Sequence, residues 1–297
     1  MKRGQLLLIA CSACLCLAPF IPFLEGPASR IVHDPAHENV TTLVTALYDI
    51  HRRDRPFDQY LPWFERTLQF PFRMVIFCKE RRVADLAWAV RRGLGLSELT
   101  TVVLEDDYPL KHLAPAVASL LDAHKEETSR WSPERNNGDY ILLQYSKFQW
   151  LLEAMRMQGR LGEKQVFFWV DAGISRFLTR GQTSLRFQTM ASNNSMSVQT
   201  VFQSEADLPS HEEFAKCIGC SQNLFKAGIF GGTEDVMRWV SREMLKILTT
   251  EMIATKLHRI GNEQQAFALL YSRYPKKFRL LFPEADFGSG DCNFICL

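Results

Sequence analysis

The sequence predicts an α/β fold in which helices flank a mostly parallel sheet, preceded by an N-terminal hydrophobic segment. Two observations support this fold class. Short apolar runs alternate with segments of helical periodicity as far as residue 175, which is typical of strand–helix–strand units. The run Val166–Val170 is apolar at every position, as expected of an interior parallel strand that is buried on both faces. We therefore expect a single domain over residues 40–285.

The elements of the first half follow in order from hydrophobic periodicity. Strands are predicted where short apolar runs end in polar residues: Thr42–Tyr48, Arg73–Cys78, Thr100–Leu104 and Val166–Val170. Helices are predicted where apolar residues recur every three or four positions: Phe57–Leu68, Val83–Leu94, Leu113–Lys125 and a segment from Tyr140 to Met155. Residues 128–138 are mostly polar and are expected to form a loop.

The second half of the domain has a looser pattern. The polar stretch Ser184–Phe202 contains alternating segments that suggest short antiparallel strands. Lys226–Phe230 is predicted as the last strand, and Gly231–Gly232 is expected to end it in a turn. Two helices complete the prediction: the first is capped by Thr233, and the second runs from about Asn262 to Ser272.

The charge of the chain is nearly balanced. Lys and Arg together number 35 and Asp and Glu 33, which gives a formal net charge of +2. Lys2 and Arg3 are the only charged residues before Glu25, so the remainder of the chain is neutral overall. Sequence-independent binding to nucleic acid or to an anionic membrane surface needs a clear cationic excess. The composition therefore argues against these two classes, and we expect no nucleic-acid partner.

The N-terminal residues 1–30 are predicted to direct the chain into the secretory pathway. Lys2 and Arg3 precede the uncharged apolar run Leu6–Leu24, which as a helix would span ~28 Å. Positive charge before the run favours a lumenal body behind a single-pass type II anchor in the Golgi or ER membrane. Small residues at Gly26-Pro27-Ala28 leave a cleaved signal and a secreted protein as the alternative, and a buried hairpin as a third. Residues 286–297 are expected to be a tail.

Two further features concern this compartment. Asn39 and Asn193 each begin a glycosylation sequon. Cys217 and Cys220 form a CxxC motif, which we interpret as a structural disulfide or two unreactive thiols. A thiol oxidoreductase is disfavoured, because the motif comes late in the chain after a polar stretch and not beside an early strand–helix–strand unit. The other CxxC of the sequence, Cys11–Cys14, lies in the N-terminal apolar run, so no second motif of this kind in residues 40–285 could complete a zinc site.

The first candidate site residue is Asp171, which follows the buried run Val166–Val170. Ligands of open parallel sheets bind beyond the carboxyl ends of the strands, so a carboxylate there is rigidly held at a binding edge. Gly173 would let another backbone or a phosphate come close. Such an aspartate suits a hard cation bridging a diphosphate, or a sugar hydroxyl. An aspartate that merely caps the turn is the alternative.

A second candidate set comes at the end of the first strand: Thr45, Tyr48, Asp49, Arg52 and Arg53. Small residues at this point leave room for a base and a ribose, and an arginine can neutralise phosphate. The stretch His51–Arg55 is also compatible with a solvated loop.

Two helix starts supply the remaining candidates. Gly231–Gly232 precedes a first turn that carries Glu234 and Asp235, which would repel an anion, so that turn suits neutral hydroxyls. The triplet Asn262-Glu263-Gln264 starts a helix with two amides and a carboxylate, which could hold or deprotonate a hydroxyl. Helix capping is the alternative for this triplet.

Four of these segments together resemble a known family. Thr42–Ile50, Val166–Phe177 (VFFWVDAGISRF), Gly228–Gly232 and Asn262–Gln264 are similar, in this order, to motifs of the HtrL/YibB family. The resemblance covers about residues 40 to 285. That family is found in bacterial surface-polysaccharide loci and in some eukaryotes, and it is regarded as glycosyltransferase-like. The same order resembles nucleotide-sugar glycosyltransferases of the GT-A type, which implies a GT-A-like, Rossmann-like fold.

The resemblance also implies a function and a set of roles. It implies transfer of a sugar from a nucleotide-sugar donor to a glycan or glycoconjugate acceptor, with Asp171 and Glu263 as the catalytic residues. The donor-binding residues that it implies are Thr45, Ala46, Tyr48, Asp49, Arg52, Lys147 and Gly173. The acceptor-binding residues that it implies are Gly231, Gly232, Asp235, Asn262 and Gln264.

The sequence departs from the GT-A pattern at two positions. GT-A enzymes carry an Asp-x-Asp motif that binds a divalent metal, Mn²⁺ or Mg²⁺, together with the donor diphosphate. Asp171 stands at the position of the first aspartate of this motif, but Gly173 replaces the second aspartate. The resemblance therefore leaves metal binding by Asp171 open. Asn262 replaces the aspartate of the usual Asp-Glu pair, and the candidates for an inverting base are Glu263 and Asp235. A non-catalytic lumenal protein that binds a carbohydrate or a nucleotide sugar is the alternative function.

Overall fold

The computed structural model describes residues 40–52, 55–128, 137–158, 165–177, 194–202, 204–216, 223–254 and 260–282. Several features predicted above lie outside these residues: the N-terminal segment, both sequon asparagines, Cys217 and Cys220, Arg53, and the tail 286–297. Within the described part of the chain, no helix combines the length and the apolar character that crossing a membrane requires.

The described residues form a mixed sheet of seven strands in the order β3-β2-β1-β4-β6-β5-β7. The strands are β1 (Val40–Leu47), β2 (Arg73–Cys78), β3 (Thr100–Leu104), β4 (Gln165–Val170), β5 (Met196–Thr200), β6 (Phe225–Thr233) and β7 (Phe278–Leu281). Strands β1 to β4 are mutually parallel, β6 runs antiparallel to β4 and β5, and β7 is parallel to β5. The predicted α/β fold with a mostly parallel sheet is confirmed.

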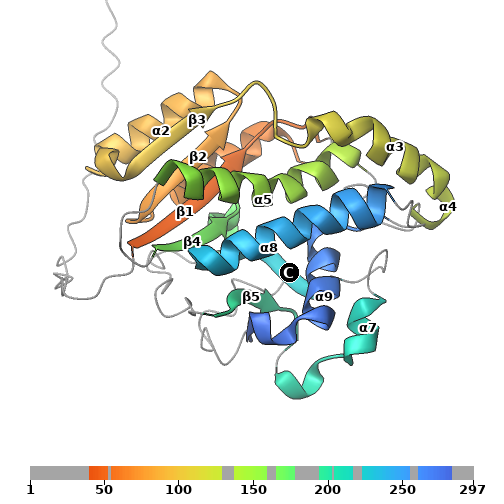
Figure 1. Cartoon of the computed structure of the whole chain (residues 1–297). Helices are drawn as coiled ribbons and strands as arrows, with labels where there is room; N and C mark the ends of the chain where they lie inside the picture. Colours follow the sequence, from red (N-terminus) through yellow and green to blue (C-terminus); the bar gives the residue numbers. More distant parts are fainter. Residues whose placement is uncertain are drawn as a thin grey trace, which may run out of the picture. The chain divides into compact units, whose positions relative to one another are not determined.

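Helices cover the sheet, and Figure 1 shows α5 and α8 lying side by side across one face. The helices are α1 (Tyr60–Thr67), α2 (Arg81–Gly93), α3 (Ala114–Ala123), α4 (Lys125–Thr128), α5 (Gly138–Gln158), α7 (His211–Ala215), α8 (Glu234–Lys246) and α9 (Glu263–Arg273). A π-helical turn, Ile247–Ala254, continues α8, and short 3-10 turns include η1 (Phe57–Gln59) and η4 (Ile174–Phe177). The predicted helices therefore all exist, with ends that differ by a few residues.

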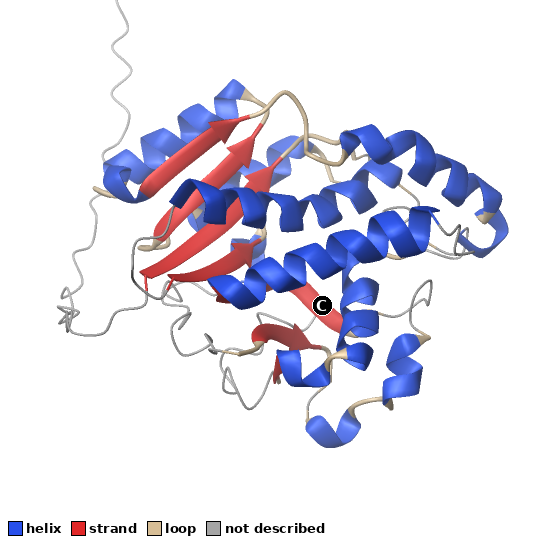
Figure 2. Ribbon diagram, viewed as in Figure 1, coloured by secondary structure: helices blue, strands red, loops and turns tan. Residues whose placement is uncertain are grey.

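The core has two parts, one on each face of the sheet. Figure 2 shows the layers of helices and strands between which these parts lie. Strand β4 contributes to both, because successive side chains point to opposite faces. Phe167 and Trp169 belong to the larger part beneath α5, α8 and α9, whereas Phe168 and Val170 belong to the part beneath α1 and α2. All six residues of β4 are buried, so the prediction of an interior strand is confirmed.

One prediction for this region is wrong. The strand predicted over Lys226–Phe230 does not end in a turn at Gly231–Gly232 but runs through both glycines to Thr233, and β7 follows it later in the chain. The reason for the glycine at 231 is packing against β4. A Cβ atom there would lie 2.3 Å from Cδ1 of Phe168 and 2.4 Å from the carbonyl oxygen of Phe167, so no side chain fits.

Candidate functional site

The described residues enclose a cavity of about 530 Å³ at the carboxyl ends of β1 and β4. The segments that follow these two strands supply Tyr48–Arg52 and Asp171–Ile174 to its lining. The antiparallel direction of β6 brings the beginning of that strand, Phe225–Ile229, to the same edge. Residues of α5 and the first turn of α9 complete the wall. The location agrees with the rule that ligands bind beyond the carboxyl ends of parallel strands.

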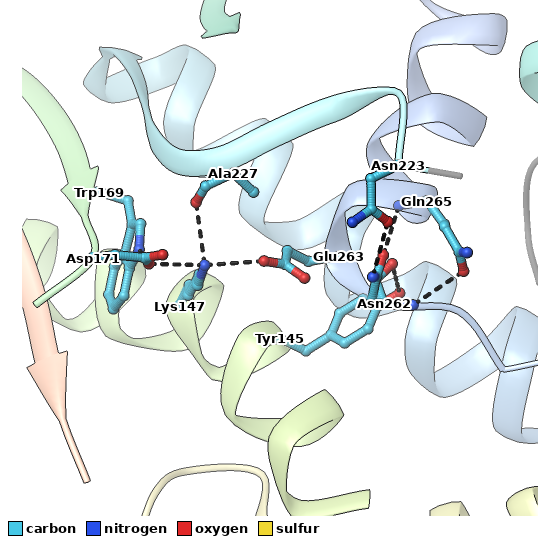
Figure 3. Close-up of polar contacts among 9 residues, drawn as sticks. All are labelled: Tyr145, Lys147, Trp169, Asp171, Asn223, Ala227, Asn262, Glu263 and Gln265. Atoms are coloured by element: carbon cyan, nitrogen blue, oxygen red, sulfur yellow. Dashed lines mark hydrogen bonds and ion pairs between the residues drawn. The ribbon is translucent and has the colours of Figure 1, made fainter. Parts of the chain in front are cut away.

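Lys147 of α5 is the centre of the polar network in this cavity (Figure 3). Its Nζ lies 2.9 Å from Oδ1 of Asp171 and 3.0 Å from Oε1 of Glu263, and it donates a hydrogen bond of 3.1 Å to the carbonyl of Ala227. The side chains of Lys147 and Glu263 are 8% and 1% exposed, whereas that of Asp171 is 43% exposed. Asp171 is therefore the member of this trio that a ligand can reach.

Burial and charge oppose each other in this trio. Burial raises the pKa of Glu263 above its ordinary value, although the ammonium of Lys147 acts to lower it. Burial acts to lower the pKa of Lys147, but Asp171 and Glu263 together outweigh it and raise that pKa. Lys147 is consequently a permanent cation, held by two carboxylates in a poorly solvated place.

A column of aromatic rings orients Asp171. The indole nitrogen of Trp169 donates a hydrogen bond of 2.6 Å to Oδ1 of Asp171. The Trp169 ring stacks on Trp150, with centroids 5.9 Å apart, and Trp150 stacks on Tyr48 at 5.1 Å. Glu105 accepts hydrogen bonds from the Tyr48 hydroxyl, at 2.6 Å, and from the Trp150 indole, at 2.9 Å. The column holds Asp171 in one orientation, and it also commits the Tyr48 hydroxyl to Glu105.

The first turn of α9 presents Glu263 to Lys147. Asn262 is the N-cap, and its Oδ1 accepts a hydrogen bond of 3.0 Å from the backbone nitrogen of Gln265. Its Nδ2 donates to Oδ1 of Asn223 at 3.2 Å, so the carboxamide of Asn262 has structural partners on both sides (Figure 3). Tyr145 fixes the turn by donating to the carbonyl of Asn262 at 3.2 Å. The helix start thus combines capping by Asn262 with placement of Glu263 in the cavity wall beside Lys147.

Most predicted site residues line the cavity. They are Ala46, Tyr48, Asp49, Arg52, Lys147, Asp171, Gly173, Asn262, Glu263 and Gln264. Thr45 does not line it, because its side chain is fully buried within the sheet, one position before the residue that reaches the cavity.

Gly231, Gly232 and Asp235 do not line the cavity either, so the structure does not bring them together with the other predicted site residues. Because β6 is antiparallel to β4, its end lies at the opposite edge of the sheet, where Thr233 pairs with Val166 near the start of β4. Asp235 begins α8 at that same edge. Sequence patterns locate a strand but do not give its direction, and the direction decides which end meets the site.

Several cavity residues were not predicted as site residues from the sequence. They include Arg55, Tyr60, Tyr140, Gln144, Trp169, Arg176, Asn223 and Lys226. For Arg176 a signal existed, because it follows Asp171 by only five positions and a single short turn keeps it at the same edge. For Tyr60 and Tyr140 the sequence held no such signal, since these residues reach the cavity only through the packing of α1 and α5.

The residues present do not fit the divalent metal that the GT-A resemblance implies. Oδ1 of Asp171 already accepts from Lys147 and Trp169, so an ammonium holds the place beside this carboxylate where a cation would bind. A side chain at position 173 would press on α1, because its Cβ would lie 3.3 Å from the ring of Tyr60 and 3.5 Å from that of Trp63. Among the described residues, no group of three His, Cys, Asp or Glu side chains is placed to hold a metal ion.

A family model described as "Bacterial protein of unknown function (HtrL_YibB)" matches residues 39–291 of the chain. No curated protein matches the chain.

Proposed function

The chain belongs to the HtrL_YibB family, and from this premise and the geometry of the cavity we propose that it is a glycosyltransferase of the GT-A type. It transfers a sugar from a nucleotide-sugar donor to a glycan or glycoconjugate acceptor. The observation that carries the proposal is Asp171, a 43% exposed carboxylate at the end of a buried strand, oriented by Lys147 and Trp169 in a 530 Å³ cavity. A cavity of this size suits a ligand of nucleotide-sugar dimensions.

The proposed roles follow from position and charge. Asp171 accepts hydrogen bonds from hydroxyl groups of the donor sugar, because a fixed carboxylate with an exposed oxygen is a strong acceptor. Ala46, Tyr48 and Asp49 line the side of the cavity beyond β1, where the nucleoside is proposed to lie. Glu263 is proposed as a positioning residue, since its side chain is only 1% exposed and holds Lys147 in place.

The proposed reaction is a substitution at the anomeric carbon of the donor sugar. An acceptor hydroxyl oxygen forms a bond to that carbon and releases its proton to water. The bond between the carbon and the diphosphate breaks, and its electron pair stays on the diphosphate oxygen. Stabilising this negative charge is the main catalytic demand, and fixed cationic groups meet it without reorganisation. Lys147, Arg52, Arg55, Arg176 and Lys226 line the cavity and supply such charge.

A non-catalytic binding protein is the second candidate. Gly173 stands where GT-A enzymes have a second aspartate, and Asp171 is already paired with Lys147. This arrangement favours a protein that binds a carbohydrate or a nucleotide sugar without turning it over. Both candidates are proposed to act in the lumen of the secretory pathway, in the Golgi or ER behind a type II anchor or as a secreted protein.

A donor screen tests the proposal and separates the two candidates. The full chain is incubated with a panel of nucleotide sugars, with and without Mn²⁺, and mass spectrometry follows release of the nucleotide and transfer to glycan acceptors. Binding is measured in parallel by titration calorimetry. Turnover of at least one donor supports a transferase, whereas binding without turnover supports the binding protein. If no nucleotide sugar binds, the transferase is rejected, and if no glycan binds either, the binding protein is rejected as well.

The substitution Asp171→Asn sharpens this test. An asparagine oxygen still accepts hydrogen bonds from Lys147 and Trp169, so the melting temperature should stay close to that of the wild type. Transfer should fall by at least about 100-fold, because the charge that orders the donor is lost. Asp122→Asn on the exposed face of α3 is the matched control and should leave transfer unchanged. Equal transfer by Asp171→Asn and the wild type would remove Asp171 from the site.

A further inference from the structure

Three arginines approach the cavity from the two loops that meet at its edge. Arg52 and Arg55 come from the segment after β1, and Arg176 comes from η4, after β4. Strands β1 and β4 are paired and parallel, so the segments that follow them emerge at the same edge of the sheet. We call Arg52, Arg55 and Arg176 the arginine cluster.

Aromatic side chains hold two members of the arginine cluster. Cζ of Arg52 lies 4.7 Å from the ring centroid of Tyr140, and its Nη1 lies 3.5 Å from the hydroxyl of Tyr60. Cζ of Arg176 lies 5.5 Å from the ring centroid of Trp63. Cation–π contacts to the face of a ring restrict the orientation of a guanidinium. Arg52 and Arg176 are thus positioned before any ligand arrives.

Helix α1 ties this arrangement to the end of β4. Tyr60 and Trp63 are both on α1 and pack edge to face, with ring centroids 5.4 Å apart. Thr67 of the same helix donates a hydrogen bond of 2.9 Å to the carbonyl of Ala172, next to Asp171. Gly173 fits against the two rings because it has no Cβ. The rings that support the arginines are therefore the same rings that a side chain at position 173 would crowd.

The charges in this part of the cavity favour an anion. Burial lowers the pKa of Arg176, and the neighbouring charge of Arg55 lowers it further. Two guanidinium groups that repel each other are stabilised when an anion with several oxygen atoms lies between them. The oxygen atoms of a diphosphate match the forked arrangement of guanidinium N–H donors.

We infer that the arginine cluster binds the diphosphate of the donor and takes over the charge-neutralising role of the divalent metal in GT-A enzymes. The inference rests on the proposed function, because it requires a nucleotide sugar in the cavity. When the bond to the anomeric carbon breaks, the electron pair left on the diphosphate is stabilised by guanidinium groups. Binding of the donor therefore does not depend on Mn²⁺ or Mg²⁺.

Nucleoside diphosphates test this inference directly. The full chain is titrated calorimetrically with UDP, GDP, ADP and dTDP, and with the matching nucleosides, once in EDTA and once in Mn²⁺. At least one diphosphate should bind with the same affinity in both conditions and more weakly at high salt. Arg52→Gln and Arg176→Gln should each weaken it by about tenfold or more, since each removes a charge-assisted contact. The nucleoside should bind these variants and the wild type alike.

Arg92→Gln is the matched control, because Arg92 is exposed on α2 and does not line the cavity. Arg52→Lys and Arg176→Lys keep the positive charge but lose the forked N–H donors of the guanidinium. These variants should bind the diphosphate with an affinity between those of the wild type and the Gln variants. Thermal melting verifies that each variant is folded. Diphosphate binding that requires Mn²⁺, or folded Gln variants that bind like the wild type, would overturn the inference and leave the proposed function intact. Absence of any nucleotide or nucleotide-sugar binding by the wild type would overturn both.

Discussion

The ammonium nitrogen of Lys147 lies 3.0 Å from Oε1 of Glu263, although the two residues are 116 positions apart in the chain. Both side chains are almost completely buried, and Oε2 of Glu263 has no hydrogen-bond partner among the described residues. A buried pair of this kind contributes little net stability as a whole, but removing one partner leaves the other charge unpaired in a poorly solvated place.

The first prediction concerns this pair. Lys147→Met should lower the free energy of unfolding by about 3–5 kcal/mol, because Glu263 is then buried without a countercharge. The double variant Lys147→Met/Glu263→Gln should recover much of that loss. Urea denaturation followed by circular dichroism measures both. The exposed pair Lys216–Glu212 is the control, and Lys216→Met should have little effect. A double variant as unstable as Lys147→Met would contradict the prediction.

The second prediction concerns pH. The pKa of Glu263 is raised above 4.5, chiefly by burial, so the folded chain binds this proton more tightly than the unfolded chain does. The stabilisation from this proton is fully present below pH 4.5 and is lost as the pH rises through the folded-state pKa. The unfolding free energy of the wild type should therefore fall relative to that of Glu263→Gln as the pH rises across this range. Urea titrations of both proteins at a series of pH values measure the difference, and a constant difference would refute the assignment.

The third prediction concerns Arg91, a fully buried arginine that does not line the cavity. Burial lowers its pKa to about 10. Its guanidinium donates to the hydroxyl of Thr100 and to the carbonyls of Leu68, Phe70, Phe72 and Leu99. Arg91→Met leaves these buried oxygens without their donor and should cost about 3 kcal/mol or more.

The neighbouring residue provides the control for Arg91. Arg92 is exposed on the same helix, so Arg92→Met replaces the same side chain without depriving buried carbonyl oxygens of a hydrogen-bond donor. The midpoint of urea unfolding should drop strongly for Arg91→Met and hardly at all for Arg92→Met. Similar midpoints for the two variants would mean that the carbonyls find other partners.

The fourth prediction separates packing from function at the two glycines of β6. A Cβ at Gly231 would lie 2.3 Å from the ring of Phe168, whereas at Gly232 the nearest atom is the carbonyl oxygen of Ser195 at 3.1 Å. Gly231→Ala should therefore destabilise the protein by about 3 kcal/mol or more, and considerably more than Gly232→Ala. Thermal melting measures both. Selective loss of acceptor binding by a stable Gly231→Ala protein would contradict this prediction and support an acceptor role for Gly231.

The sequence predicted most elements of the fold because the patterns that define them are local. The apolar run of β4 and the 3.6-residue spacing on α5 reflect contacts that any window of the chain reveals. Asp171 was found for the same reason, since it directly follows a recognisable buried strand. Its neighbours Tyr60 and Tyr140 were not found, because they reach the cavity only through the packing of helices that precede and follow it in the chain.

The sequence by itself determined the class of fold, the near-neutral charge of the chain, and the candidates Asp171, Lys147 and Glu263. Only the tertiary structure decided that Lys147 joins the other two, that Asp235 and the Gly231–Gly232 pair lie at the far edge, and that Arg55 and Arg176 line the cavity. The physical reason is the pairing of β6 with β4. Strand direction depends on hydrogen bonds between segments distant in sequence, and reversing one strand exchanges which of its ends meets the cavity.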